Sequence, residues 1–183
     1  MMFPAWDESL FKLINEWHSD SRDTFMIFLS DKYVWIPLYA ILIWKIYQNN
    51  QKAIKAALLY IVLSILWADQ ISSSLLKPWI KRLRPSHVEA FQSWIHIPNG
   101  AGGLYGFCSS HAANAFAVAM CFYLLTQNKR ISIALFIWAA LVSFSRIYLG
   151  VHYPIDVLTG AMVGLSGAFF LKKLVYDKLT RNS

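Results

Sequence analysis

The sequence predicts an all-α fold: an integral-membrane helical bundle with about five spanning helices and additional interfacial helices at the N-terminus. Hydrophobic residues make up 57% of the 183 residues and charged residues only 15%, which is too apolar for an average soluble domain. Apolar runs recur at lengths close to the ~20 residues that cross a bilayer. Eight Trp, nine Tyr and twelve Phe are typical of lipid-facing surfaces and interfacial aromatic belts. The length fits a single domain, residues 1–183.

Residues 1–32 are expected to form the interfacial helices. Apolar residues recur there at helical spacing, with charged residues opposite, which is typical of a helix lying in the membrane interface. A helix packed on the surface of the domain itself is an equally good interpretation. A signal peptide is not expected, because the basic segment, continuous apolar core and cleavage site are missing. The two faces are Trp6, Leu10, Leu13, Ile14 and Trp17, and Asp7, Glu8, Lys12 and Glu16.

Five later segments are predicted to span the bilayer. The first and third are short for a spanning helix, so flanking residues, or the apolar stretch 24–30 in the case of the first, must contribute. The segments are 33–48, 53–76, 109–126, 131–149 and 155–175.

Basic residues predict the orientation. They flank the turns between spans one and two and between spans three and four, and they follow span five, so these regions are cytoplasmic by the positive-inside rule. The loops 77–108 and 146–154 then lie outside, together with the first 32 residues. Five basic residues in the outside loops run against the rule and need another function: Lys77, Lys81, Arg82, Arg84 and Arg146.

The formal net charge of +7 would suggest a nucleic-acid partner in a soluble protein. Here the basic residues stand at the ends of apolar runs or inside one motif, so membrane topology and phosphate binding account for them, and no nucleic-acid partner is expected. Cys108 and Cys121 have neither metal-ligand nor disulfide spacing. Cys121 lies within an apolar run and is expected to pack there.

Three motifs meet at the predicted outer face. Lys77, Arg84 and Pro85 follow the second span, in the pattern Lys-x6-Arg-Pro. The sequence Cys108-Ser109-Ser110-His111 opens the third span. The last motif joins the fourth and fifth spans, in the pattern Ser-Arg-x5-His-x3-Asp, and comprises Ser145, Arg146, His152 and Asp156.

With these motifs the chain resembles the type 2 phosphatidic acid phosphatase (PAP2) family, which includes vanadium haloperoxidases and bacterial acid phosphatases. The first and third motifs match, whereas in the Pro-Ser-Gly-His motif Cys108 replaces proline and Ser110 replaces glycine. The resemblance implies a lipid phosphatase that needs neither metal nor cofactor. It implies three catalytic residues: His152 as nucleophile, Asp156 as its orienting carboxylate and His111 as general acid.

The chemistry of the residues agrees with these roles. Arginine provides a planar, permanently charged fork for phosphate, and Lys77 adds a compact charge. The start of the third span presents free N–H groups to an anion. A histidine can donate and accept protons near neutral pH. The predicted phosphate-binding residues are Lys77, Arg84, Ser109, Ser110 and Arg146, with no metal ligands.

Other residues have weaker interpretations. Asp69, within the second span, is expected to support the bundle rather than react. Arg82 is about equally well interpreted as functional or as a surface residue, whereas Lys81 is expected to be a solvated or head-group contact. Gly160 and Gly164 have helix-packing spacing, inside the bundle or at a dimer face, so the oligomeric state stays open. His87 and His96 are expected to be loop residues, and the glycine-rich stretch 99–103 is expected to shape or gate access to the site.

The leading substrates are undecaprenyl diphosphate, phosphatidylglycerophosphate and phosphatidic acid, followed by lipid A phosphates. The small size resembles family members acting on polyprenyl diphosphate, which favours that class. The expected location is the bacterial cytoplasmic membrane, with the active site facing the periplasm or exterior. Two alternatives remain: vanadate-dependent haloperoxidase chemistry and a non-catalytic phospholipid-binding membrane protein.

Overall fold

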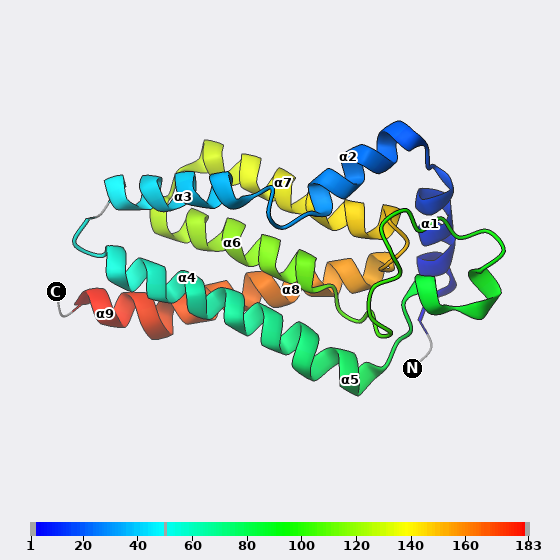
Figure 1. Ribbon diagram of the computed structural model, residues 1–183. Helices are drawn as coiled ribbons and strands as arrows, with labels where there is room; N and C mark the ends of the chain where they lie inside the picture. Colours follow the sequence, from blue (N-terminus) through cyan, green and yellow to red (C-terminus); the bar gives the residue numbers. More distant parts are fainter. Residues whose placement is uncertain (1–2, 50, 182–183) are drawn as a thin grey trace.

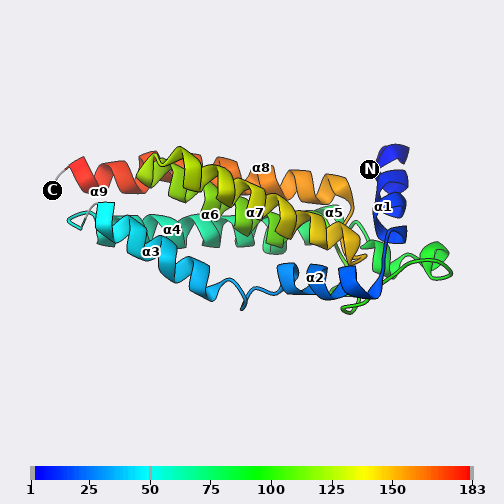
Figure 2. The same ribbon diagram turned by 90° about the horizontal axis from the view of Figure 1, so that it is seen from above.

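The computed structural model describes residues 3–49 and 51–181, and this part of the chain is helical with no strands. Five long helical segments run side by side as an elongated bundle, and a short helix, α1, lies across one end (Figure 1, Figure 2). The bundle helices are α3 (Ile36–Asn49), α4 (Ile54–Asp69), α6 (Ser110–Thr126), α7 (Lys129–Tyr148) and α8 (Pro154–Leu171). Helices α1 (Ala5–Glu16) and α2 (Asp20–Ser30) precede them.

Two of the bundle helices continue beyond their regular α-helical parts. Helix α4 runs through the π-helical turn η1 (Gln70–Leu76) into α5 (Lys77–Ile80). Helix α8 runs through η4 (Lys172–Tyr176) into α9 (Asp177–Arg181). The predicted outside loop therefore begins at Lys81 rather than at Lys77, because the helix ends where Lys81 adopts a left-handed conformation with φ of 52°.

Three helices of the described chain are long and apolar enough to cross a membrane: Ile54–Ile80, Lys129–Tyr148 and Pro154–Arg181. They correspond to the second, fourth and fifth predicted spans. Helix α6, with 17 residues, and α3, with 14, are shorter, as the sequence indicated. The stretch 24–30 does not extend α3, because it belongs to the separate helix α2 and a turn intervenes.

The glycine spacing in α8 serves packing inside the bundle. A Cβ added at Gly160 would lie 2.4 Å from the carbonyl oxygen of Ser109, and one at Gly164 would lie 2.0 Å from that of Ala113. Only glycine lets α8 approach α6 this closely. This contact holds the start of α6 beside the start of α8, where the Ser109 N–H donates to the Asp156 carbonyl at 2.9 Å.

Helix α1 packs differently from the expected amphipathic arrangement. Its buried side chains are Asp7, Phe11 and Asn15, so Asp7 does not share an exposed charged face with Glu8, Lys12 and Glu16. Trp6 and Leu13, by contrast, are 51% and 68% exposed. The polar side chain of Asp7 can be buried against the end of the bundle, because its carboxylate accepts hydrogen bonds from the Arg82 guanidinium and the Ile155 N–H.

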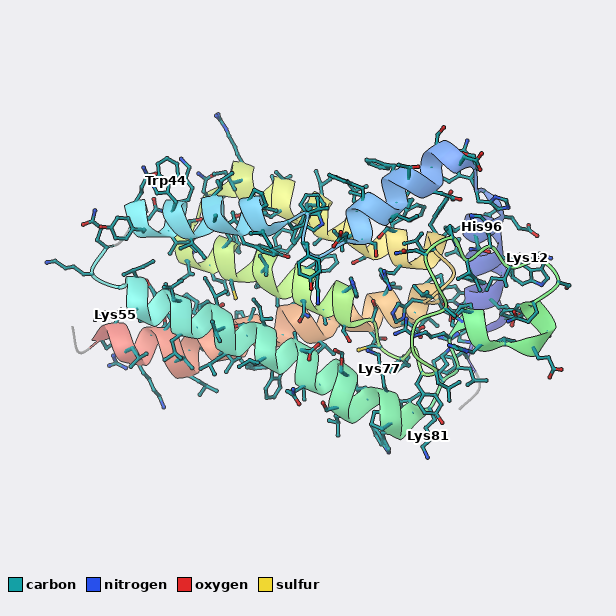
Figure 3. All side chains as sticks on the ribbon, in the orientation of Figure 1. Lys12, Trp44, Lys55, Lys77, Lys81 and His96 are labelled. Carbon is teal, nitrogen blue, oxygen red and sulfur yellow. The ribbon has the colours of Figure 1, made fainter. Side chains whose placement is uncertain are left out.

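The loop between α5 and α6 covers the same end of the bundle as α1 (Figure 1). Asn15 links this loop to the end of α7, because its side chain donates to the carbonyl of His96 in the loop and to that of Tyr148 in α7, each at 2.8 Å. The imidazole of His96 lies 2.8 Å from Asp23 and stacks on His18. His96 therefore serves as a structural loop residue. Figure 3 shows Lys77, Lys81 and His96 toward this end, whereas Trp44 and Lys55 lie toward the other.

Candidate active site

His152 lies in the short connection between α7 and α8 and is only 1% exposed. Burial first, and then the positive charges of Arg84, Arg146 and Lys77, hold the pKa of His152 well below its usual range. The imidazole is therefore neutral near pH 7, the form that a nucleophile needs. The fold brings the three motifs together: Lys77 of the first motif donates to Ser110 of the second at 2.6 Å, and the Ser109 N–H of the second donates to the Asp156 carbonyl of the third at 2.9 Å.

Asp156 lies one helical turn after His152, in the first turn of α8. Its Oδ2 lies 3.5 Å from Nδ1 of His152 and accepts a hydrogen bond from the Tyr153 N–H at 3.0 Å. Pro154 occupies the first helical position, as the sequence predicted, where its fixed φ suits the helix start. Nδ1 of His152 therefore faces the carboxylate, and Nε2 lies on the opposite side of the ring.

Lys77 is held within a group of hydroxyls. Its Nζ donates to Ser110 Oγ at 2.6 Å and to Ser73 Oγ at 3.4 Å. Ser110 Oγ also bonds to Ser72 at 2.9 Å and to Ser73 at 2.8 Å. The serine that replaces the motif glycine therefore orients the lysine, a role that the sequence reasoning did not assign to it.

Arg84 is positioned by the glycine-rich part of the loop. Its N–H donates to the Leu104 carbonyl at 3.1 Å, and its Nε donates to the Tyr105 carbonyl at 3.3 Å. Gly102 has φ of +68°, and a Cβ there would lie 2.6 Å from Arg84 Nη1. The stretch expected to shape or gate access thus lies directly against the guanidinium.

Arg146, near the end of α7, offers a buried donor. Its Nη1 contacts Ser30 Oγ on α2, while its Nε is buried without a hydrogen-bond partner among the described residues. A buried unpaired donor is costly, and an anionic ligand would satisfy it. The predicted role of Arg146 in phosphate binding is compatible with this geometry.

Ser109 begins α6 as its N-cap, and its hydroxyl accepts from the Ala112 N–H at 3.4 Å. The Ser109 hydroxyl proton remains available to an anion at the helix N-terminus. Cys108, beside it, is fully buried, and burial raises the pKa of its thiol to about 11. The thiol is therefore protonated near neutral pH and is a poor nucleophile.

A groove, here called the tail groove, runs between α3 and α4 along α6 and has a volume of about 570 Å³. Its wall is mainly apolar, and it ends at Ser110 and His111. Ile43 and Val62 line it and are 44% and 52% exposed, so it opens on the outer surface of the bundle. Asp69 lines the same end of the groove and accepts from Ser73 Oγ at 3.4 Å.

Comparison with known proteins decides the family. Residues 55–179 match the PAP2 superfamily profile. The chain belongs to the PAP2 superfamily. It is 38% identical to a lipid A 4'-phosphatase of Bacteroides thetaiotaomicron over 95% of this chain and 78% of that protein. It is 33% identical to an undecaprenyl-diphosphatase of Sulfolobus acidocaldarius, over 87% of this chain and 74% of that protein.

The fold agrees with this assignment. The crystal structure of Aquifex aeolicus LpxE superposes with a TM-score of 0.71 and 26% identity, covering 93% of this chain and 96% of that one. The protein is thus a PAP2 membrane phosphatase, a hydrolase of phosphate esters, as the sequence motifs predicted. The residues proposed for catalysis and phosphate binding are matched to the family by motif alone.

This PAP2 site contains two residues that sequence reasoning missed or left open. Arg82 donates to Asp156 Oδ1 at 2.9 Å and to Asp7 Oδ2 at 2.6 Å. Its guanidinium lies 3.7 Å from the ring centroids of Phe3 and Tyr153. The sequence placed a basic residue near Arg84 but carried no signal that an N-terminal carboxylate would reach it.

Proposed function

We propose that this PAP2 phosphatase removes phosphate from a lipid head group through a phosphohistidine intermediate on His152. The tail groove carries the proposal, because an apolar groove that is open to lipid ends at His111, beside the motif residues. A soluble phosphate ester has no need of such a groove, whereas a lipid can keep its tail in it. The length and apolar composition of the helices around it support a position of this groove within the bilayer.

In the proposed first step, Nε2 of His152 attacks phosphorus and the bond to the lipid oxygen breaks. His111 donates a proton to that oxygen, and its position at the end of the tail groove suits this role, since the leaving group carries the tail. The cations stabilise the charge on the equatorial phosphate oxygens. Asp156 accepts the Nδ1–H and balances the cationic phosphoimidazole.

In the second step, His111 takes a proton from water, which attacks phosphorus and breaks the P–N bond. Inorganic phosphate leaves and His152 returns to its neutral form. The 3.5 Å separation of His152 Nδ1 and Asp156 Oδ2 is expected to shorten when phosphate binds, as catalytic hydrogen bonds commonly do.

The substrate proposed first is a lipid A-type phosphate. Identity to the Bacteroides lipid A 4'-phosphatase is higher, and extends over more of the chain, than identity to the undecaprenyl-diphosphatase. Sequence identity therefore favours a lipid A-type phosphate, whereas the small size of the chain favoured polyprenyl diphosphate. Undecaprenyl diphosphate, phosphatidylglycerophosphate and phosphatidic acid remain in the substrate class, because all join a phosphate to an apolar tail.

The proposed topology has five spans in a bacterial cytoplasmic membrane, formed by α3, the α4–α5 helix, α6, α7 and the α8–α9 helix. The active site then lies at the periplasmic or exterior end. Lys55 supports this orientation, because it lies toward the end of the bundle opposite Lys77 (Figure 3). Helices α1 and α2 lie at the exterior membrane interface.

The test is phosphate release by the purified protein in detergent, without added metal. The panel contains lipid A, undecaprenyl diphosphate, phosphatidylglycerophosphate, phosphatidic acid and a short-chain soluble phosphate ester. Release from a lipid at a much higher kcat/KM than from the soluble ester is expected, with inhibition by orthovanadate as a transition-state mimic. Equal activity on lipid and soluble esters would contradict the lipid assignment.

A further inference from the structure

Two carboxylates and one guanidinium form a buried group at the start of α8, called here the Asp7–Arg82–Asp156 triad. Asp7 and Asp156 are both 0% exposed, and the Arg82 side chain is 10% exposed. Each carboxylate pairs with a different nitrogen of the same guanidinium, at 2.6 and 2.9 Å. Burial of this depth makes an unpaired charge very costly, so the three groups depend on one another.

Asp7 holds a second bond that fixes its place. Its Oδ1 accepts from the Ile155 N–H at 2.8 Å, one of the free N–H groups in the first turn of α8. The positive end of the α8 dipole favours a carboxylate there. A residue of the N-terminal helix α1 therefore accepts a hydrogen bond from a free N–H group of α8, the helix that carries Asp156.

The charge of Arg82 bears directly on Asp156. A guanidinium bound to Asp156 alone would neutralise it and weaken its attraction for a cationic imidazole. Asp7 compensates that charge, so the triad keeps one net negative charge beside His152. The aromatic rings of Phe3 and Tyr153 lie against the guanidinium, each ring centroid 3.7 Å away, which restricts its movement and stabilises the cation.

We infer that Asp7 is a positioning residue for the phosphatase reaction: through Arg82 it keeps Asp156 oriented and anionic toward His152. The N-terminal helix is therefore part of the active site. Asp7 touches neither the proposed nucleophile nor the phosphate-binding residues, so it acts only through its two neighbours. The inference rests on the proposed function, because it assumes that His152 becomes cationic during turnover.

The test begins with Asp7→Asn, which preserves the shape of the side chain and an oxygen for the Ile155 N–H. We expect kcat to fall about 10- to 100-fold, because a small displacement of a catalytic group can cost as much as ~100-fold in rate. KM should stay within about twofold, because phosphate and tail contacts are unchanged. Glu16→Gln is the matched control: it removes one exposed carboxylate from the same helix and should leave kcat unchanged.

A second variant distinguishes positioning from simple fold support. In Asp7→Asn/Arg82→Gln the uncompensated guanidinium is also removed, which restores the single negative charge on Asp156. We expect the double variant to turn over faster than Asp7→Asn alone, a coupling that independent effects would not produce. Arg82→Gln alone completes the cycle, and effects of the two single substitutions that simply multiply would overturn the inference. Loss of the fold in Asp7→Asn itself, measured as a lost thermal unfolding transition, would also overturn it, because Asp7 would then serve the fold alone.

His152→Ala separates this inference from the proposed function. Normal turnover of His152→Ala would defeat the phosphohistidine proposal itself. An inactive His152→Ala together with wild-type kcat in Asp7→Asn would defeat only the role assigned to Asp7.

Discussion

Ser110 Oγ lies 2.6 Å from the ammonium of Lys77, although the corresponding position of the PAP2 motif is a glycine. The same oxygen bonds to Ser72 and Ser73 on the π-helical turn that precedes Lys77. The hydroxyl therefore links the start of α6 to the lysine of the first motif. The substitution of glycine by serine adds an interaction that fixes Lys77 in place.

Ser110→Ala should raise KM for the phosphate substrate about tenfold or more, since a hydrogen bond to a charged group stabilises by at least roughly 1.5 kcal/mol. The loss concerns the position of Lys77 rather than the fold. Ser74→Ala, an exposed serine on the same turn, is the control. Steady-state kinetics on both variants measure the difference, and identical KM values would refute the linkage.

The pH dependence of kcat/KM should reflect the lowered pKa of His152. Because the folded-state pKa lies below the ordinary ~6.5 of a free histidine, the nucleophile stays neutral as pH falls through ~6.5. Activity should decline only when pH falls through the lower folded-state pKa. Burial of the neutral ring likewise contributes stability above ~6.5 that is lost on acidification.

Kinetics across the acid range, compared with a phosphorus NMR titration of the substrate alone, check this expectation. The substrate titration identifies ionisation of its own phosphate. An enzyme limb at ~6.5 that is absent from the substrate titration would show an ordinary, accessible histidine and contradict the buried, cation-flanked site.

Gly102→Ala should impair the enzyme by displacing Arg84. A Cβ at Gly102 would lie 2.6 Å from Arg84 Nη1, and the positive φ of +68° disfavours any side chain. We expect kcat/KM to fall at least about tenfold with little change in melting temperature, because the loop is peripheral to the bundle core. Gly103→Ala, where nothing lies within 4 Å of the added Cβ, should be neutral. Equal effects of the two substitutions would show that the close approach to Arg84 is unimportant.

The tail groove can be obstructed without touching the motifs. Val62→Trp places a large ring at its exposed wall, so KM for a long-chain lipid phosphate should rise about tenfold, a change of ~1.4 kcal/mol. KM for a short-chain soluble phosphate should not change. Ile133→Trp is the control, since Ile133 is 60% exposed on α7 and lies outside the groove. Equal effects on both substrates would show that the tail groove does not bind the lipid tail.

The helical class and the order of the main helices follow from the sequence, because apolar runs and motif spacing are local features. The continuation of α4 to Ile80 was missed, since the basic residues after Lys77 were interpreted as a loop. The sequence could not assign Asp7 to the active site, because an aspartate on the charged face of an amphipathic helix is equally stable when it is exposed to solvent. Only tertiary structure brings Arg82 and the first turn of α8 to it.

The expected roles of the motif residues came from the resemblance to the PAP2 family rather than from any local sequence pattern. The location of Gly160 and Gly164 inside the bundle, which the sequence left open, depends on how closely α8 meets α6. The orienting role of Ser110 likewise depends on a π-helical turn that no periodicity signals.

The phosphohistidine mechanism is tested most directly by capture of a phosphoenzyme, using a lipid substrate with labelled phosphate and rapid quenching of the wild-type protein and of His152→Ala. The phosphohistidine mechanism predicts label on the wild-type protein that is acid-labile and stable to alkali, as a phosphoramidate is. It also predicts no label and no phosphate release with His152→Ala. A His152→Ala protein that still carries label, or still releases phosphate at the wild-type rate, would contradict it.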